Sequence, residues 1–326
     1  MIIVRLSGGM GNQMFQYAAA LAAAKRLGTE LVLDLAWYNQ HTAKLGRLYS
    51  LGCFPEIKER HACFRDVRSV FPWQAFDNYM TNHQFFKYLG RRLVKCCMLN
   101  AKLLPEGKAW EFLCESDSLL LPIPASRVYA HVKPCYSPRF EAIPDNVYMT
   151  GYPCSEKFFL SIAEEVRRKF AFSQDILHSP NLEKIRRSNS VSVHVRRGDK
   201  VHEAGYFVSD EEYIRCAVER VCARIENPVF FVFSDDIIWC KNRLPHLYDV
   251  SWSFMEGAGG QDAAKDLALM SLCKHNIVGP SSLSWWGAWL NRNPEKIVIA
   301  PCQSLWFENS ADYYDLLPED WTTLSS

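Results

Sequence analysis

Residues 191–199 read VSVHVRRGD, and they indicate the fold of the second half of the chain. A run of apolar and small residues, typical of a buried strand, ends abruptly in two arginines, a glycine and a carboxylate. In open α/β sheets, ligands bind beyond the carboxyl ends of the strands. An arginine there offers a planar set of N–H donors that matches phosphate oxygens. The segment therefore predicts a strand that presents cationic groups to an anionic ligand, with an internal Arg–Asp ion pair as the alternative.

Strands and helices alternate regularly around this segment. Short apolar runs predict strands at 191–195, 229–233, 247–250, 276–279 and 297–300. Apolar residues at helical spacing predict helices at 210–224, 237–242, 263–274 and 284–290. We also expect a helix at 155–170. Such an alternation is typical of a doubly wound parallel sheet flanked by helices.

The beginning of the chain predicts a second unit of the same kind. A strand at 2–6 leads into a glycine loop at 7–11, an alanine-rich helix at 12–27 closed by Gly28, and a strand at 31–35. This is a βαβ unit with a right-handed crossover. Residues 36–153 follow an irregular pattern of aromatic, proline and basic residues. We therefore expect two α/β domains, one at residues 1–150 and a second, Rossmann-like one at residues 151–326.

Composition limits the functional classes. The 326 residues are 48% hydrophobic, which is enough for two cores, and the net charge of +1 argues against nucleic-acid binding. The 12 cysteines are scattered, as expected of reduced thiols. The first residues do not resemble a signal peptide, and no apolar run approaches the ~20 residues that span a bilayer. These features predict a soluble, cytoplasmic protein.

One basic run has two interpretations. Residues 85–104 contain no acidic residue and carry the bases Lys87, Arg91, Arg92, Lys95 and Lys102. The preferred interpretation is the solvated face of an ordinary helix. The alternative is a basic amphipathic helix that makes peripheral contact with the inner membrane face through residues 87–102.

The glycine loop at the start of the chain has the character of a ligand site. Gly9 and Gly11 allow close approach to the backbone, and the helix that follows offers unpaired N–H groups. The loop lacks the third glycine of a dinucleotide fingerprint and the lysine of a P-loop. The amides of Asn12 and Gln13 favour sugar hydroxyls as the ligand. A plain strand-to-helix turn is the alternative.

A second turn, at residues 279–287, reads GPSSLSWWG. Ser281 and Ser282 fall where a strand ends and a helix begins, so their hydroxyls and the helix N–H groups suit a phosphate. One serine could instead merely cap the helix. We expect Trp285 and Trp286 to be core residues.

Acidic residues complete the candidate site. Asp235 and Asp236 follow the strand at 229–233. Asp266 lies on a predicted helix, where it could accept hydrogen bonds from a purine base; a solvated residue of the helix face is the equal alternative. The sequence has neither an Asp-x-Asp triplet nor a His-x-x-x-His pair. We therefore expect no metal site.

Several of these motifs together resemble one enzyme family. They are residues 8–17 (GGMGNQMFQY), 194–199 (HVRRGD), 233–236 (FSDD) and 281–289 (SSLSWWGAW). In this order they are similar to the motifs of α-1,2-fucosyltransferases, glycosyltransferase family 11. The resemblance implies a GT-B-like architecture of two Rossmann-like domains facing a cleft. It also implies GDP-fucose as donor, a β-galactoside as acceptor, inversion at the anomeric carbon, and no metal or other cofactor.

The resemblance assigns roles to individual residues. It places Arg196 on the β-phosphate and His194 and Asp266 on the nucleoside. It places Ser282, with Ser281, on the phosphate. We expect the donor site to include Gly9, Gly11, Gln13, Arg197 and Asp235. Arg196, Asn12 and Asp199 are expected to form the catalytic group, with Asn12 orienting the acceptor and Asp199 orienting the arginines. Many relatives have tyrosine where this chain has Lys200.

Two other functions fit parts of the sequence. A nicotinamide-dependent oxidoreductase would share the Rossmann-like topology, but its glycine fingerprint is missing. A glycan-binding module could use the 10 tryptophans and 14 tyrosines. Such a module has no need of arginines at a strand end. The ordered motifs favour the transferase.

Overall fold

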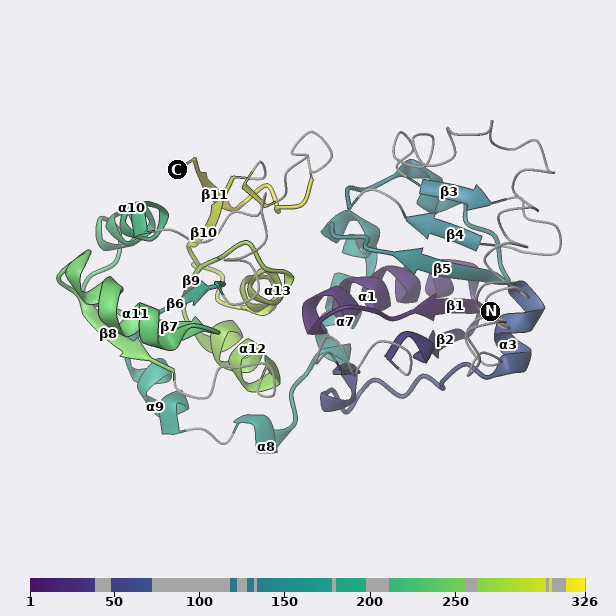
Figure 1. Ribbon diagram of the computed structural model, residues 1–326, viewed down its shortest axis with the longest axis horizontal. Helices are drawn as coiled ribbons and strands as arrows, with labels where there is room; N and C mark the ends of the chain where they lie inside the picture. The colour runs from purple at the N-terminus through teal and green to yellow at the C-terminus, as the bar shows by residue number, and fades with distance from the viewer. Residues whose placement is uncertain are drawn as a thin grey trace, which may run out of the picture. The chain divides into compact units, whose positions relative to one another are not determined.

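The computed structural model in Figure 1 describes most of the chain, namely residues 1–38, 48–71, 118–121, 128–131, 134–177, 180–197, 211–255, 263–302, 305–306 and 315–325. Contacts divide the chain into two compact units, Met1–Gly52 with Glu56–Lys169 and Cys53–Pro55 with Phe170–Ser326. Two ion pairs attach the helix before this division to the first unit. The Lys169 Nζ atom lies 2.7 Å from Glu59 Oε1, and the Lys25 Nζ atom lies 2.8 Å from Glu165 Oε1. The first unit is therefore longer than the 150 residues expected.

The first unit contains a five-stranded sheet in the order β2-β1-β5-β4-β3. All neighbours are parallel except β3 and β4. Its strands are β1 (Ile2–Arg5), β2 (Leu31–Asp34), β3 (Ser118–Leu121), β4 (Val128–His131) and β5 (Val147–Gly151). Its helices are α1 (Met10–Leu27), α3 (Phe64–Val70) and α7 (Ala163–Lys169), with 3-10 turns η1 (Leu51–Cys53), η2 (Pro138–Ala142), η3 (Glu156–Phe158) and η4 (Leu160–Ile162).

The helix α1 confirms the expected βαβ opening. Its alanines are buried, because small side chains let the helix backbone lie close to the sheet. Gly28 ends the helix with φ of 62°, and its N–H donates to the carbonyls of Ala24 and Lys25. The helix begins at Met10 rather than at Asn12, so the glycine turn is shorter than predicted.

The second unit contains a six-stranded parallel sheet in the order β11-β10-β9-β6-β7-β8. Its strands are β6 (Asn189–Val195), β7 (Pro228–Ser234), β8 (Ser251–Phe254), β9 (His275–Ile277), β10 (Val298–Pro301) and β11 (Thr322–Leu324). Its helices are α8 (Gln174–Leu177), α9 (Pro180–Arg187), α10 (Glu211–Cys222), α11 (Ile237–Arg243), η6 (Leu244–His246), α12 (Ala263–Leu272) and α13 (Ser282–Leu290). The predicted class, α/β with parallel sheets flanked by helices in two Rossmann-like units, is confirmed.

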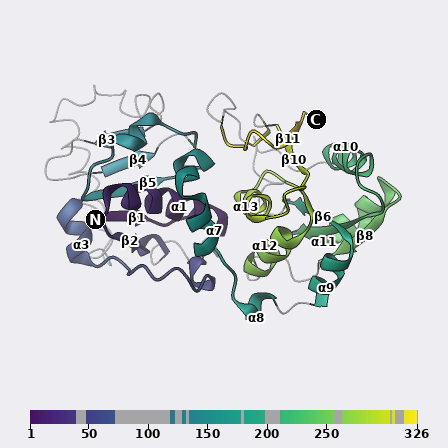
Figure 2. The ribbon, with the colours of Figure 1, turned by 180° about the vertical axis from the view of Figure 1, so that it is seen from behind.

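Helices cover both faces of this second sheet. Alternate residues of a strand point to opposite faces. Phe230 and Val232 pack with residues of α10 and α11, whereas Phe231 and Phe233 pack with residues of α9 and α12. Figure 2 shows the same helices from behind. Both faces of β7 are apolar, which explains why its residues 229–233 read as a continuous hydrophobic run.

Helix α13 packs closely on α12 through a glycine. A β-carbon at Gly287 would lie 2.9 Å from the β-carbon of Met270. The neighbouring Trp285 and Trp286 are fully buried, as the sequence predicted. The absence of a side chain at Gly287 therefore sets how closely the two helices approach.

Three local predictions were wrong. The strand expected at 247–250 lies at Ser251–Phe254, because Leu247 closes a 3-10 turn by donating its N–H to the Leu244 carbonyl. The helix expected at 155–170 is divided into η3, η4 and α7. The strands β3 to β5 come from the region that the sequence left irregular. The basic run 87–102 lies outside the described residues.

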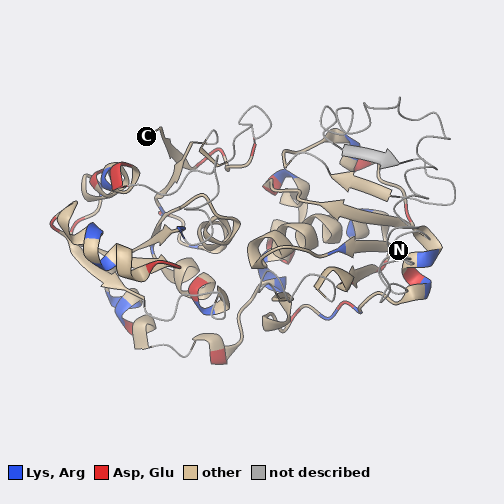
Figure 3. Cartoon of the chain, in the orientation of Figure 1, with Lys and Arg blue, Asp and Glu red and all other residues tan. Residues whose placement is uncertain are grey.

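The distribution of charged residues and the apolar character of the helices agree with what the composition indicates. Among the described residues, bases and acids are interspersed over both units (Figure 3). In that part of the chain, no helix has the length and apolar character needed to cross a membrane.

Candidate functional site

The second sheet has a topological switch point between β6 and β9. From β6 the chain builds outward through β7 and β8, and it then returns to β9 on the other side of β6. The pairs Val195 with Ser234 and Val193 with Ile277 bring the carboxyl ends of these three strands to one edge. Crevices at such switch points are where open α/β sheets bind ligands.

Arg196 directly follows β6 at this edge and is paired with Asp235, which follows β7. The Arg196 Nη1 atom lies 2.7 Å from Asp235 Oδ2, and 33% of the arginine side chain remains exposed. The other oxygen of the same carboxylate accepts a hydrogen bond of 2.8 Å from the Arg197 N–H. Asp235 therefore orients the arginine segment. The predicted orienting residue Asp199 lies outside the described residues.

Arg197 is fixed by residues at the start of α11. Its guanidinium carbon lies 3.9 Å from the centre of the Trp239 ring, and its Nε atom lies 3.4 Å from Asp236 Oδ2. Asp236 also caps α11, because its Oδ1 atom accepts a hydrogen bond from the Trp239 N–H. An aspartate just before a helix is a recognisable capping signal, but the Arg197–Trp239 contact has no signal in the sequence.

His194 of β6 is buried. Only 8% of the residue is exposed, and its Nδ1 atom is buried without a hydrogen-bond partner among the described residues. Burial lowers the pKa of His194 to about 4; the Arg196 charge also lowers it, and Asp235 opposes this. The imidazole is therefore neutral at pH 7. His194 precedes Arg196 by two positions in the sequence.

The serine turn lies between β9 and α13. Ser284 closes it, since the Ser284 hydroxyl accepts from the Gly279 N–H at 2.9 Å and donates to the Gly279 carbonyl. Ser281 occupies the cap position of α13, yet its side chain makes no capping hydrogen bond. Ser281 and Ser282 are partly exposed. Their hydroxyls and the first N–H groups of α13 can together bind an anion.

Asp266 lies in the first turn of α12, which packs against α13. Helices of a parallel α/β sheet run antiparallel to the strands, so their first turns lie at the carboxyl edge. The sheet therefore brings Asp266 to the same edge as Arg196 and the serine turn. The side chain is partly buried.

The glycine turn belongs to the first unit and lies at the carboxyl end of β1. Gly8 has φ of 75°, and a β-carbon there would lie 2.9 Å from Asn12 Nδ2. A β-carbon at Gly9 would meet no atom within 4 Å, so a ligand can reach the backbone at this point. Asn12 is partly exposed beside it, whereas Gly11 is buried.

Gln13 makes its hydrogen bonds within the protein. Its Nε2 atom donates to the carbonyls of Gly8 and Leu48, and its Oε1 atom accepts from the Ser50 N–H at 2.8 Å. The buried amide thus joins residues 48–50 to the glycine turn. Its predicted contact with the donor remains a prediction.

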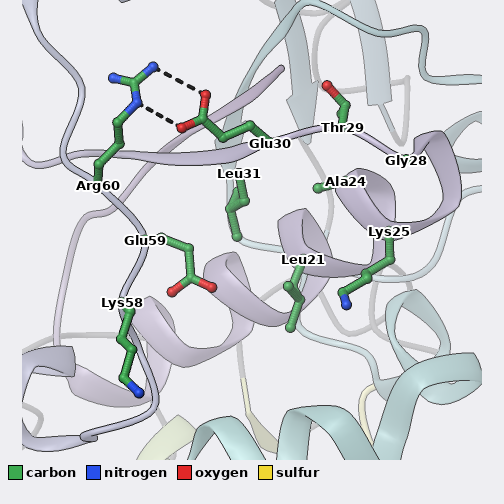
Figure 4. Close-up of a pocket in the computed structure, with 10 residues that line it drawn as sticks. All are labelled: Leu21, Ala24, Lys25, Gly28, Thr29, Glu30, Leu31, Lys58, Glu59 and Arg60. Carbon is green, nitrogen blue, oxygen red and sulfur yellow. Dashed lines mark hydrogen bonds and ion pairs between the residues drawn. The ribbon is translucent and has the colours of Figure 1, made fainter.

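A separate pocket lies at the other end of α1, around Gly28. It has a volume of about 530 Å³ and is lined by Leu21, Ala24, Lys25, Gly28, Thr29, Glu30, Leu31, Lys58, Glu59 and Arg60 (Figure 4). The Arg60 guanidinium faces Glu30 there, with an Nε–Oε1 distance of 2.8 Å. None of the predicted site residues lines it. Among the described residues, no group of three or more His, Cys, Asp or Glu side chains could hold a metal ion.

Comparisons with known proteins find one matching family model and several similar sequences. The family model described as "Glycosyl transferase family 11" matches residues 118–323. The chain is 31% identical to an "Alpha-1,2-colitosyltransferase" of Escherichia coli, over 99% of this chain and 98% of that protein. It is 33% identical to the "Galactoside alpha-(1,2)-fucosyltransferase 2" of Sus scrofa, over 49% of this chain and 50% of that protein.

Solved structures of fucosyltransferases are similar at a lower level. The fucosyltransferase NodZ from Bradyrhizobium has a TM-score of 0.48 and 15% identity, over 88% of this chain and 90% of that chain. NodZ alpha-1,6-fucosyltransferase soaked with GDP-fucose has a TM-score of 0.47 and 15% identity, over 89% of this chain and 92% of that chain.

Proposed function

We propose, from the premise that the chain belongs to glycosyltransferase family 11, that it transfers L-fucose from GDP-fucose to the 2-hydroxyl of a terminal β-galactose. The glycosyl acceptor is an oligosaccharide, such as an O-antigen or a lactose-like glycan. The reaction inverts the anomeric carbon and needs no metal. Membership of a transferase family argues against a glycan-binding module and against an oxidoreductase.

The position of Arg196 carries this proposal. The guanidinium is partly exposed at the switch point, in the same sheet edge as the serine turn and the start of α13. As the glycosidic bond breaks, negative charge develops on the β-phosphate of the leaving GDP. An arginine, hydroxyl groups and helix N–H groups placed beforehand can stabilise this charge, in the role that a divalent cation has in other transferases.

Neighbouring residues would bind the rest of the donor. The neutral imidazole of His194 can hydrogen-bond to the nucleoside, and Asp266 can accept from the N–H groups of guanine. Arg197 and Asp235 would hold the phosphate-binding segment in place. In this proposal the donor domain is the second unit, which lies within residues 151–326 apart from Cys53–Pro55.

The acceptor would bind to the first unit, which contains residues 1–150 except Cys53–Pro55 and extends to Lys169. Inversion requires the attacking hydroxyl on the face of fucose opposite to GDP. The open space at Gly9 and the adjacent Asn12 amide suit a sugar hydroxyl at this point. A cytoplasmic place of action belongs to the same proposal.

A second donor has an observation in its favour. A relative that matches over nearly the whole length is named as a colitosyltransferase. Colitose is fucose without its 3-hydroxyl, so one site can accommodate either sugar. Discrimination depends on whether a protein group hydrogen-bonds the 3-hydroxyl, because an unpaired buried polar group makes the deoxy sugar unfavourable.

An assay with both donors tests the proposal. The purified chain is incubated with GDP-fucose or with GDP-colitose, with lactose as acceptor and EDTA present, and products are identified by mass spectrometry and NMR. We expect a product with fucose linked to O2 of galactose. Transfer from GDP-colitose alone would show that colitose, and not fucose, is the donor sugar. Dependence on an added divalent cation would refute the metal-free mechanism.

A further inference from the structure

A group of hydroxyls at the carboxyl edge of the first sheet belongs to none of the predicted site residues. Ser7 follows β1, and Tyr152 follows the neighbouring parallel strand β5, so both lie at the same edge. The Ser7 hydroxyl donates a hydrogen bond to the Tyr152 hydroxyl at 3.3 Å. Ser7 is 9% exposed, whereas Tyr152 is 43% exposed.

A buried glutamine forms hydrogen bonds with Ser7 and with the residue that precedes Tyr152. Gln16 of α1 is 2% exposed, and its Nε2 atom donates to the Ser7 hydroxyl at 3.0 Å and to the Gly151 carbonyl at 2.9 Å. Its Oε1 atom accepts from the Ser7 N–H at 2.9 Å. One side chain thus connects the ends of both strands.

The backbone before Tyr152 has a conformation that requires glycine. Gly151 has φ of 108°, and a β-carbon there would lie 2.0 Å from the His131 carbonyl oxygen. Only glycine permits this close approach of β4 and β5. The backbone conformation of Gly151 therefore fixes where Tyr152 follows β5 at the edge of the sheet.

The direction of the hydrogen bonds leaves one donor for a ligand. The Gln16 amide donates to Ser7, and Ser7 donates to the Tyr152 oxygen. The Tyr152 O–H then has its own proton to give, and hydrogen bonds in such a series strengthen one another. The contacts include no charged side chain, so they suit a neutral ligand with hydroxyl groups rather than a phosphate.

We propose that Tyr152 and Ser7 form a subsite for a neutral hexose, the β-galactoside acceptor, with Gln16 as a positioning residue. This inference rests on the proposed function, and it adds the residues that contact the acceptor. The ring of Tyr152 offers an apolar face to the C–H side of the sugar, while its hydroxyl donates to a sugar oxygen. The glycine turn with Asn12 lies at the same edge, so Asn12 and Tyr152 are at one end of the sheet.

Kinetics of Tyr152 variants test the subsite. Rates are measured with saturating GDP-fucose and varied methyl β-galactoside. Loss of one neutral hydrogen bond in Tyr152→Phe should raise the acceptor KM about 3- to 10-fold. Tyr152→Ala, which also loses the ring, should raise it further. The donor KM and the slow hydrolysis of GDP-fucose without acceptor should change less than about twofold, because these variants leave the second unit untouched.

Tyr136→Phe is the matched control. Its hydroxyl donates to the exposed Glu141, which pairs with Arg26 in the last turn of α1, far from Ser7 along that helix. It should leave the acceptor KM unchanged. An unchanged KM in Tyr152→Ala, or an effect on the donor KM instead, would overturn the subsite.

Direct sugar binding separates the subsite from the reaction. Saturation-transfer NMR with methyl β-galactoside and GDP should show binding to the wild type and a loss of binding in Tyr152→Ala. If the wild type transfers no fucose yet shows this pattern, the proposed function fails and the subsite stands. If the sugar does not bind the wild type, or binds Tyr152→Ala equally, the subsite is wrong.

Discussion

At the scale of single residues, the candidate site combines partners that are far apart in the chain. Asp235 holds both Arg196 and the Arg197 N–H, and Trp239 stacks on Arg197. In the alternative interpretation of residues 191–199 an arginine pairs with the aspartate of that segment; Asp199 lies outside the described residues, so this stays a prediction. Arg196 does form an ion pair in the structure. The ion pair is formed with Asp235 and leaves a third of Arg196 exposed, so the pairing and a ligand-binding role are compatible.

Arg196→Ala should reduce catalysis strongly while the fold persists. Loss of one donor to the leaving phosphate should lower kcat/KM on the order of 10²-fold. GDP affinity, measured by calorimetry, should fall as well. Arg215→Ala is the matched control, since Arg215 is an exposed arginine of α10 that pairs with Glu212. Equal GDP affinity in wild type and Arg196→Ala would remove this residue from the phosphate site.

The buried amide of Gln16 should contribute to stability as well as to the proposed subsite. Gln16→Leu leaves the Ser7 N–H and the Gly151 carbonyl without this partner, and each unsatisfied buried group costs about 1–3 kcal/mol. Urea unfolding should therefore show a lower free energy of unfolding. A variant as stable as the wild type would mean that water or another group replaces the amide.

At the scale of elements, strands and helices with clear periodicity were predictable, and those defined by contacts were not. The buried strand at 191–195 and the alanine-rich helix both form, because their burial pattern follows from their own residues. The strand predicted at 247–250 was wrong, since its apolar residues close a turn and β8 pairs with β7 four residues later. β5 is central in its sheet although Val147–Gly151 gives a weak local pattern.

Gly287→Ala tests the close packing of α12 and α13. The added β-carbon would meet the Met270 β-carbon at 2.9 Å, so the helices must separate, at a cost of about 1–3 kcal/mol. Chemical unfolding should show this loss. Met270→Ala should not rescue it, because alanine keeps the β-carbon that causes the contact.

Gly52→Ala serves as the control for this substitution. A β-carbon at Gly52 would have as its nearest neighbour a Tyr49 ring atom at 3.6 Å, an ordinary contact. Its stability should equal that of the wild type. A stable Gly287→Ala variant would show that the two helices adjust without cost.

At the scale of the whole molecule, each unit contains a histidine that burial keeps neutral. The pKa is lowered to about 4 for His131 in the first unit and for His194 in the second, in both cases mainly by burial. Protonation therefore favours the unfolded chain, where histidine has its ordinary pKa of about 6.5. The neutral form stabilises the fold above pH 6.5, and this stability is lost as the pH falls toward 4.

Acid should accordingly weaken both units. The free energy of unfolding, measured with urea at a series of pH values, should fall between pH 6.5 and 4, on the order of 3 kcal/mol for each histidine. In a His131→Gln, His194→Gln double variant the dependence on pH in this range should be flatter. A wild-type profile as flat as that of the double variant would contradict the burial of these rings.

The sequence by itself determined the strand–turn–helix units, the buried tryptophans and the family, because these depend on residues close together in the chain. Only the tertiary structure decided which side chains work together. The Gln16 amide donates a hydrogen bond to the Gly151 carbonyl, 135 positions away in the sequence. The Arg197 N–H donates one to the Asp235 carboxylate, 38 positions away. Both contacts arise because parallel pairing places the carboxyl ends of neighbouring strands at one edge of a sheet. Strand order and register are set by the burial of the whole sheet, which no short segment encodes.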